Sequence, residues 1–207
     1  GTSTAALQMA RLLSDLGFKV VCIEINDPEA SPSIFRFMDF NESKHYPGGY
    51  HIDGIDLFSN DKDIAVDRII SEYEYAVLDL GHLINKPQLH PNIEFFSRAQ
   101  VQMITSGSSD WDFDRLTSAI SAFQIHNITK KLNVLFNFIS DQRFSELKKT
   151  FTKEEKESFN LNFFHFPYKP NQIEIDAEMK DVLSTVIAEY IPSKKNKSKW
   201  KTWLKGK

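Results

Sequence analysis

The feature that most restricts the fold of this chain is the regular alternation of short apolar runs with helix-like segments. The apolar runs are rich in β-branched and aromatic residues and lie at 19–26, 51–58, 75–80, 99–105, 131–139 and 161–166. Helix-like segments lie at 4–16, 61–73, 112–123 and 174–190, together with a highly charged helical surface stretch at 141–159 and a weakly helical one at 28–38. Strands that alternate with helices predict an α/β fold, a mostly parallel sheet with helices on both faces. Such sheets bind ligands at the carboxyl ends of their strands.

Local signals refine this outline. Gly17 stands where a helix C-cap glycine belongs, and Gly54 predicts a bulge or a close backbone approach inside the strand at 51–58. Ser and Asp residues at 108–112 predict a capped helix start, with Trp111 packing on the surface of the core.

The composition is that of one globular domain, with 41% hydrophobic residues among 207. Cys22 is the single cysteine, so the chain forms no internal disulfide, which fits a reducing compartment. We expect Cys22 to be a buried, inert thiol because it lies in an apolar run. The six histidines show no ligand spacing, and we expect no metal site built from protein ligands alone.

The first residues, Gly1-Thr2-Ser3-Thr4, place a glycine and three hydroxyls directly before a helical stretch. A phosphate-binding loop uses glycine for close backbone approach, a helix N-terminus, a lysine, and a hydroxyl for Mg²⁺. All but the lysine are present, because Thr2 follows Gly1 where the lysine would stand. The same residues also suit an ordinary helix N-cap, and both interpretations remain open.

With the motifs further along, this start resembles the deviant-Walker P-loop ATPases of the MinD/ParA type, in the SIMIBI class. The resemblance covers the chain up to about residue 190 and lies in the order of four weak motifs. EINDP (24–28) is similar to the family's Asp-x-Asp-Pro pattern, and YAVLDLG (75–81) is similar to its Walker B strand. VLFNFIS (134–140) is similar to its adenine-contacting strand, and FHFPYKPN (165–172) is similar to the loop that packs against the base. The resemblance implies that the first strand and the start of the P-loop lie upstream of residue 1. We therefore expect a groove beside the strand at 75–80.

The resemblance also implies a site for ATP and Mg²⁺. The nucleotide-binding candidates are Gly1, Thr2, Ser3, Thr4, Asp79, Asn137, Pro167 and Lys169, with Ser3 and Asp79 as the Mg²⁺ ligands; the catalytic candidates are Glu24, Asn26 and Asp27. His82 is expected near this site. The residues alone leave simpler roles open: an Asp before Gly81 suits a turn, and a buried Asn137 amide needs only an internal hydrogen bond.

Two departures from the family pattern bear on activity. Thr2 replaces the loop lysine, and Ile25 falls on the first Asp position, with Glu24 one residue away. Lost charge stabilisation weakens phosphoryl transfer. We therefore expect a positioning, partitioning or scaffold protein that binds ATP and hydrolyses it weakly or not at all, similar to the TadZ-like branch of the family. Nucleotide-dependent homodimerisation would be its switch. The alternatives are a nucleotide-free structural adaptor and an active ATPase in which Glu24 or Asp27 compensates.

The last fifteen residues differ from the rest. Residues 193–207 carry seven Lys and no acidic residue. Residues 1–192 therefore hold 18 basic and 28 acidic residues, a net charge of −10. In a helix from about 198, Trp200, Trp203 and Leu204 would share one face among lysines, which suits an anionic membrane surface. MinD-type proteins are similar in reaching membranes this way, so we expect a cytoplasmic domain over 1–192 and a peripheral anchor. Non-specific DNA binding and a solvated tail remain alternatives.

Overall fold

The computed structural model describes residues 2–25, 41–42, 48–59, 65–81, 92–128, 131–167 and 174–191. Within these ranges the elements follow in the order α1 (Thr2–Asp15), β1 (Val20–Glu24), β2 (Asn41–Glu42), β3 (Tyr50–Ile52), β4 (Ile55–Phe58), α2 (Val66–Ile70), β5 (Tyr75–Asp79), α3 (Ile93–Arg98), β6 (Gln102–Ser106), α4 (Asp110–Ile125), β7 (Leu132–Asn137), α5 (Asp141–Thr150), α6 (Lys153–Ser158), β8 (Leu161–Phe166) and α7 (Ala177–Ile187).

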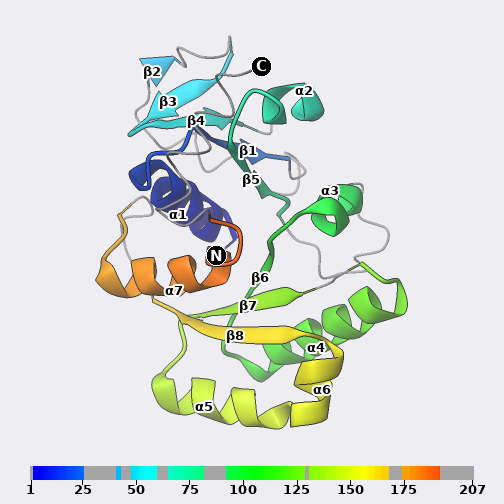
Figure 1. Cartoon of the computed structure of the whole chain (residues 1–207). Coiled ribbons are helices and arrows are strands. Elements are labelled where there is room, and N and C mark those ends of the chain that lie inside the picture. The colour runs from blue at the N-terminus through cyan, green and yellow to red at the C-terminus, as the bar shows by residue number, and fades with distance from the viewer. Residues whose placement is uncertain are drawn as a thin grey trace.

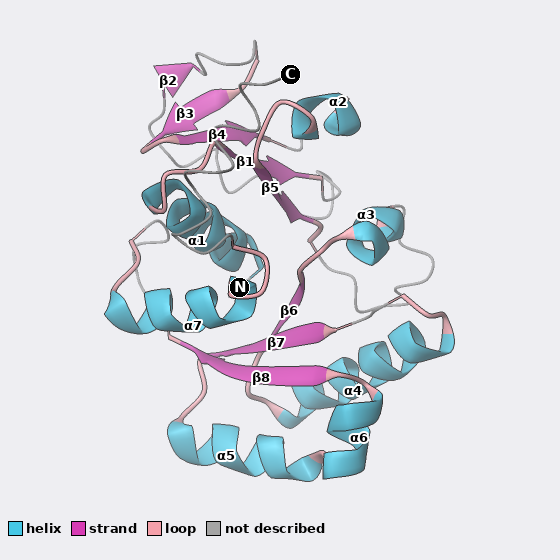
Figure 2. Cartoon of the chain, in the orientation of Figure 1, coloured by secondary structure: helices cyan, strands magenta, loops and turns pink. Residues whose placement is uncertain are grey.

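The described strands form two sheets (Figure 1, Figure 2). The larger has the order β2-β3-β4-β1-β5, in which β4, β1 and β5 are parallel and β2 and β3 are antiparallel. The smaller, β6-β7-β8, is parallel throughout. This confirms the expected α/β fold with mostly parallel strands and helices on both faces. The single sheet expected from the sequence is, among these residues, two sheets.

Helix α1 joins the two sheets. It is rich in Ala and Leu, which are strong helix formers, and it ends before Gly17, whose φ of +86° suits a residue without a Cβ. One hydrophobic cluster contains α1 and α7 together with Cys22 and Val77 of the larger sheet and Leu135 of the smaller. Because both sheets bury apolar residues against the same two helices, the cluster holds them in one body.

Two contacts at the ends of α1 fix the direction of the strands beside it. Phe18, just after α1, packs edge-on against Tyr75 at the start of β5, with ring centroids 4.7 Å apart. Thr2, at the start of α1, shares a hydrogen bond of 2.9 Å with the Thr105 hydroxyl near the end of β6. The start of α1 therefore lies at the carboxyl ends of both β5 and β6, and these two strands run in the same direction.

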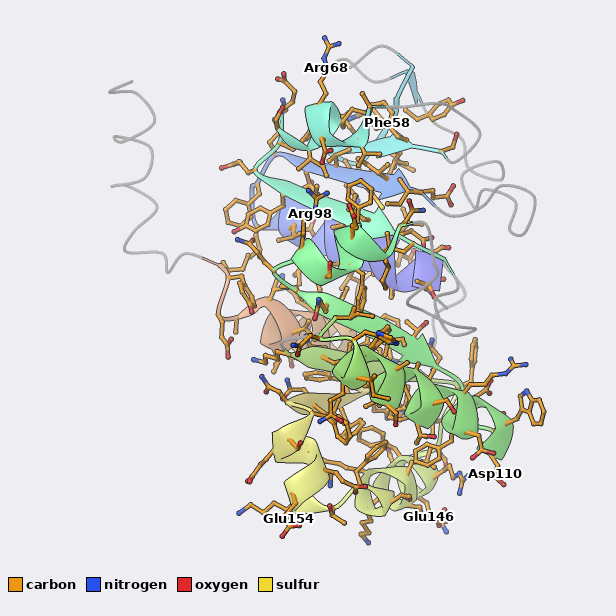
Figure 3. The ribbon with its side chains drawn as sticks, turned by 90° about the vertical axis from the view of Figure 1, so that its right-hand side faces the viewer. Phe58, Arg68, Arg98, Asp110, Glu146 and Glu154 are labelled. Carbon is orange, nitrogen blue, oxygen red and sulfur yellow. The ribbon has the colours of Figure 1, made fainter. Side chains whose placement is uncertain are left out.

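The smaller sheet has its own core. Its strands pack on α3, α4 and α5 through a cluster that includes Phe96, Leu116, Phe123, Phe136 and Leu147. Side-chain caps begin the outer helices: Ser109 for α4, Ser140 for α5 and a full capping box at Thr152 for α6. Charged side chains lie on their outer faces, and Figure 3 shows Asp110, Glu146 and Glu154 projecting away from the body.

Three expectations need correction. The run at 51–58 is a hairpin of β3 and β4, because Asp53 and Gly54 both have positive φ, 48° and 83°, and make a tight turn. The helix expected to reach residue 73 ends at Ile70. Trp111 is 67% exposed and lies under the Arg115 guanidinium, 5.4 Å from the ring centroid, instead of on the core.

Other expectations fall partly or wholly outside the described residues. These are the weak helix at 28–38, residues 61–64 of the helix expected from 61, and the tail at 193–207. The six-residue helix α3 and the two-residue strand β2 were not expected from the sequence.

Candidate nucleotide site

A pocket of about 900 Å³ lies between β5 and β6, so the expected groove beside 75–80 is present. Residues of both strands line it along their length. Helix α1 contributes Ala5, Ala6 and Met9 from one side, and α3 contributes Phe95 and Phe96 from the other. Figure 1 shows α1 and α3 on opposite sides of these strands, and Figure 3 views the side of α3, with Arg98 labelled.

The polar end of the pocket lies at the carboxyl ends of the strands, where α1 begins. It is formed by Thr2, Ser3, Gly81, Ser106, Gly107, Asp112, Arg115, Asn137 and Phe138. Hydroxyl groups, a helix N-terminus and an arginine thus converge at the edge where parallel sheets bind ligands. This composition suits an anionic ligand better than a neutral apolar one.

Asp79 and Glu24 lie side by side on the face of the larger sheet that α1 covers. They are register partners at the carboxyl ends of β5 and β1, two residues beyond Val77 and Cys22, which pack with α1. Side chains alternate along a strand, so residues two apart share a face. Asp79 is 1% exposed and Glu24 is 2% exposed. Two buried carboxyl groups therefore lie together at the carboxyl ends of neighbouring strands.

The two oxygens of Asp79 differ. Oδ1 accepts a hydrogen bond of 3.0 Å from the Gly81 backbone N–H, as expected for a turn residue. Oδ2 is buried and has no hydrogen-bond partner among the described residues. A buried carboxylate oxygen without a partner is unfavourable by about 1–3 kcal/mol or more unless a cation or donor reaches it. The residues therefore fit a cation at Oδ2.

The donor set narrows the kind of cation. Within the described ranges there is no group of three or more His, Cys, Asp or Glu side chains that would enclose a metal. Mg²⁺ is commonly held by one or two carboxylates, with phosphate and water oxygens in the remaining positions. One carboxylate of Asp79 and the hydroxyl of Ser3 at the start of α1 match that pattern, so the site fits Mg²⁺ that arrives with a phosphate ligand.

Cys22 responds to the same charges. It is 1% exposed in the middle of β1. Burial, and then the negative charges of Asp79 and Glu24, raise the pKa of its thiol well above the ordinary value. This confirms the expected burial of Cys22, and a thiol held protonated is a poor nucleophile.

The turn after β6 brings backbone close to the start of α4. A Cβ on Gly107 would lie 2.2 Å from the Asp112 Oδ2 atom, so any other residue there would require the Asp112 side chain to move. Ser109 caps α4 by accepting from the Asp112 N–H at 3.1 Å and donates to the Asp112 carboxylate at 2.6 Å. One turn further on, Arg115 lines the pocket. Sequence reasoning missed Arg115 because nothing in the pattern of this helix shows which face meets β6.

Asn137 and Phe138 form the far side of the polar end. Asn137 is the last residue of β7 and lines the pocket. Phe138 follows with a φ of +54° and a ring that is 64% exposed. A left-handed backbone at a bulky residue is unfavourable by about 1–2 kcal/mol, and such conformations cluster at ligand sites.

The structure brings together some of the sequence-predicted residues. Thr2, Ser3 and Asn137 line one pocket, and Asp79 and Glu24 are buried beside it, absent from its lining. Thr4 and Pro167 are described but do not line this pocket. The remaining candidates lie outside the described residues: Gly1, Asn26, Asp27, His82 and Lys169.

Comparison with solved structures places this arrangement in a known fold. The chain is similar to the MinD cell division protein of Aquifex aeolicus, at 15% identity and a TM-score of 0.54, with 93% of each chain covered. It is similar to a chain of the MinC:MinD cell division protein complex of the same organism, at 16% identity and a TM-score of 0.55, again with 93% of each chain covered. The chain has a MinD-like fold. No family model matches it, and no curated protein matches its sequence.

None of the helices in the described ranges is both long enough and apolar enough to cross a membrane.

Proposed function

We propose that this protein binds ATP with Mg²⁺ at the polar end of the pocket and uses binding, with weak or no hydrolysis, as the switch of a positioning or scaffold protein. The observation that carries the proposal is the buried carboxylate of Asp79 at the carboxyl end of β5, one oxygen of which has no hydrogen-bond partner within the described ranges. A MinD-like fold and a helix that begins with hydroxyl residues at the same edge support it.

Each group at this end has a role toward such a ligand. The N–H groups at the start of α1 and the hydroxyl of Ser3 would face phosphate oxygens, and Asp79 would hold Mg²⁺. Arg115 would supply positive charge where the loop lacks its lysine. Asn137 offers an amide to a base edge, and the Phe138 ring offers a flat apolar surface beside it. Mg²⁺ would contribute charge neutralisation at the phosphates.

Weak hydrolysis follows from what the described site offers. Ile25 stands at the expected first Asp position and has no carboxylate that could orient an attacking water, and Glu24, one residue away, is buried in β1. Phosphoryl transfer depends on positioned charge and on a residue that orients the attacking water. Binding would then act by mass action, stabilising the form that dimerises, with the basic tail as membrane anchor.

The test is to titrate ATP into the full-length protein in a calorimeter, once in the presence of Mg²⁺ and once in the presence of EDTA. We expect micromolar affinity that weakens at least tenfold, about 1.4 kcal/mol, in EDTA and in Asp79→Asn. Asp56→Asn is the matched control. Asp56 is equally buried in the same sheet, but it lies in β4 and both of its carboxylate oxygens are hydrogen-bonded. The affinity of the Asp56→Asn variant for ATP should therefore be unchanged. No binding at millimolar ATP would favour a nucleotide-free adaptor. Turnover that Asp79→Asn removes would favour an active ATPase.

A further inference from the structure

Strand β8 is the outermost strand of the smaller sheet. In the described part of the chain β8 pairs only with β7, so its other edge belongs to no ladder there. Figure 2 shows β8 at the end of this sheet, on the far side of β7 from β6. An edge of this kind presents a row of backbone N–H and C=O groups to any strand that can reach it.

A backbone hydrogen bond shows which groups of β8 face outward. The Leu132 N–H donates to the Asn160 carbonyl at 3.1 Å, so the carbonyl just before β8 is directed at β7. Because the polar groups of successive residues point to opposite sides of a strand, this orientation alternates along β8. Leu161, Phe163 and His165 therefore direct their N–H and C=O groups away from β7.

β8 lacks the charges, prolines and bulges that usually keep an edge strand apart from other strands. Its sequence, LNFFHF, contains no charged residue and no proline. Its register with β7 is continuous over all six residues, so no bulge turns the edge away. The four central side chains are only partly buried. A regular, apolar and partly exposed edge of this length indicates an association surface.

Aromatic side chains lie along this edge. The Phe163 ring packs against Phe151, just after α5, with centroids 5.0 Å apart, and it remains partly exposed. His165 stacks on Phe144 and lies 3.0 Å from the Asp141 carboxylate, with 30% of its side chain exposed. Apolar ring surface beside an outward strand edge is covered more favourably by another apolar strand than by water.

A second copy of β8 fits this edge because the strand is complementary to itself. When two copies run antiparallel about a two-fold axis at Phe163, Leu161 lies opposite His165 of the second copy, and Phe163 lies opposite its own equivalent. Each outward-facing residue is then opposite another, and each such pair exchanges both of its backbone hydrogen bonds. The two Phe163 side chains become cross-strand neighbours on one face, which is a favourable pair. Pairing consumes this edge of both copies, so the assembly closes as a dimer.

The charges favour a second copy over the basic segment 193–207 as the occupant of this edge. That segment carries seven lysines, and they would find no carboxylate within LNFFHF. Two copies of an uncharged strand bring no like charges of the strand together across the axis. The composition of β8 therefore suits β8 itself.

We propose that the outer edge of β8 is a homodimerisation surface, at which two copies of the chain pair their β8 strands antiparallel about Phe163 and join their smaller sheets into one. The dimer leaves the pocket and its polar end out of the contact. It requires no nucleotide, so this proposal and the proposed function succeed or fail separately.

The first test combines sedimentation velocity with residue-resolved amide hydrogen exchange, on the full-length protein in EDTA without nucleotide. Over an about hundredfold range of protein concentration we expect monomers to give way to dimers. The amides of Leu161, Phe163 and His165 should then exchange at least about tenfold more slowly in the dimer, while those of Asn162 and Phe164, which face β7, stay protected throughout.

Three results would overturn the proposal. One is a monomer at every concentration, and another is a dimer in which the three outward amides exchange as fast as in the monomer. The third is full protection of these amides in the monomer, because another part of the same chain then covers the edge. Loss of that protection on deletion of 193–207 would assign the edge to the basic segment.

The second test compares His165→Pro with His165→Ala. Both variants lose the imidazole and its contacts with Phe144 and Asp141, but only proline lacks the N–H that faces the second copy. Proline is tolerated on an edge strand where the N–H points away from the sheet. Because the dimer contains this hydrogen bond twice, His165→Pro should dimerise at least about tenfold more weakly than His165→Ala. Equal dimerisation of the two variants contradicts the proposal.

Cysteine cross-linking tests the register and does not depend on the proline variant. Phe163→Cys places two thiols opposite one another at the two-fold axis, where a Cα separation of about 5.5 Å is one that a disulfide spans. This variant should form disulfide-linked dimers under mild oxidation. Ser118→Cys, an exposed thiol on α4, is the matched control and should stay monomeric, and Cys22 is buried in both. No cross-link in Phe163→Cys, or equal cross-linking of the two variants, contradicts the register.

Discussion

At the scale of single residues, the clearest distinction is between two equally buried carboxylates of the larger sheet. Asp56 accepts from Tyr73 at 2.7 Å, lies 2.7 Å from the His51 Nδ1 atom, and so has both oxygens in hydrogen bonds. Asp79 has one oxygen bonded and one without a hydrogen-bond partner in the described part of the chain. The sequence predicted Asp79 as a ligand residue but gave no such role to Asp56, and only the hydrogen-bond pattern shows why the two differ.

This difference predicts opposite stability effects. Asp79→Asn keeps the acceptor for the Gly81 N–H and removes a buried charge, so it should stabilise the nucleotide-free protein by about 1 kcal/mol. Asp56→Asn weakens two hydrogen bonds to a buried charge and should destabilise it by about 1–3 kcal/mol. Urea unfolding of the two variants and the parent protein without ATP measures both changes in the free energy of unfolding. Destabilisation by Asp79→Asn would mean that Oδ2 has a structural partner.

A pH effect follows from Tyr73. Burial, and then the Asp56 carboxylate that accepts its hydroxyl, raise the pKa of Tyr73 above the ordinary value of about 10. Because the folded-state pKa is the higher one, the stabilisation is complete below about pH 10 and is lost as the pH rises beyond it. Tyr73→Phe should therefore lower the free energy of unfolding at pH 7–9 by about 1–3 kcal/mol, with the difference shrinking by pH 11. A constant difference across that range would contradict this assignment.

At the scale of elements, the alternation of apolar runs was sufficient to predict most helices and strands. It failed where an element is short or where one run holds two strands. Helix α3 has six residues and shows no measurable period. In HIDGIDLF, the central Asp-Gly is a hairpin signal, but the apolar residues on either side also fit one continuous strand. In the structure the positive φ of Asp53 and Gly54 makes the turn, and Ser14 of α1 donates to the Asp53 carbonyl.

That hairpin turn allows a matched glycine comparison. Gly54 and Gly17 have nearly the same φ, 83° and 86°, so an alanine is strained at both by about 1–2 kcal/mol. A Cβ at Gly54 would also lie 2.6 Å from the Ser14 Oγ atom, whereas at Gly17 nothing lies within 4 Å. Thermal unfolding should show a larger loss for Gly54→Ala than for Gly17→Ala, and Ser14→Ala should remove the excess. Equal losses would mean that the Ser14 side chain turns away freely.

At the scale of the whole molecule, the polar end of the pocket combines residues from opposite parts of the chain. Thr2 meets Thr105, and Asn137 and Arg115 line the same space. The order of motifs predicted that Thr2, Ser3 and Asn137 belong to one site, because strand ends in a parallel sheet share an edge. No pattern in the sequence could place Arg115 there, since its position depends on the packing of α4 against β6 and β7. The roles of all these residues remain predictions.

The charge distribution gives the last prediction, which concerns residues 193–207. The remaining chain carries a net charge of −10 and is repelled by anionic lipid, so binding to vesicles must come from the seven lysines and two tryptophans of the tail. Each lysine near such a surface contributes about 1 kcal/mol, and the tryptophans add apolar burial. Co-sedimentation with phosphatidylglycerol vesicles should therefore be strong at low salt, weak at high salt and absent after deletion of 193–207. Replacing Trp200 and Trp203 by Ala keeps every charge and should still weaken vesicle binding at least tenfold. If that variant binds vesicles as well as the parent does, the tail recognises lipid charge alone and the two tryptophans have no part in binding. If the tail retains duplex DNA and not vesicles, the membrane assignment is wrong.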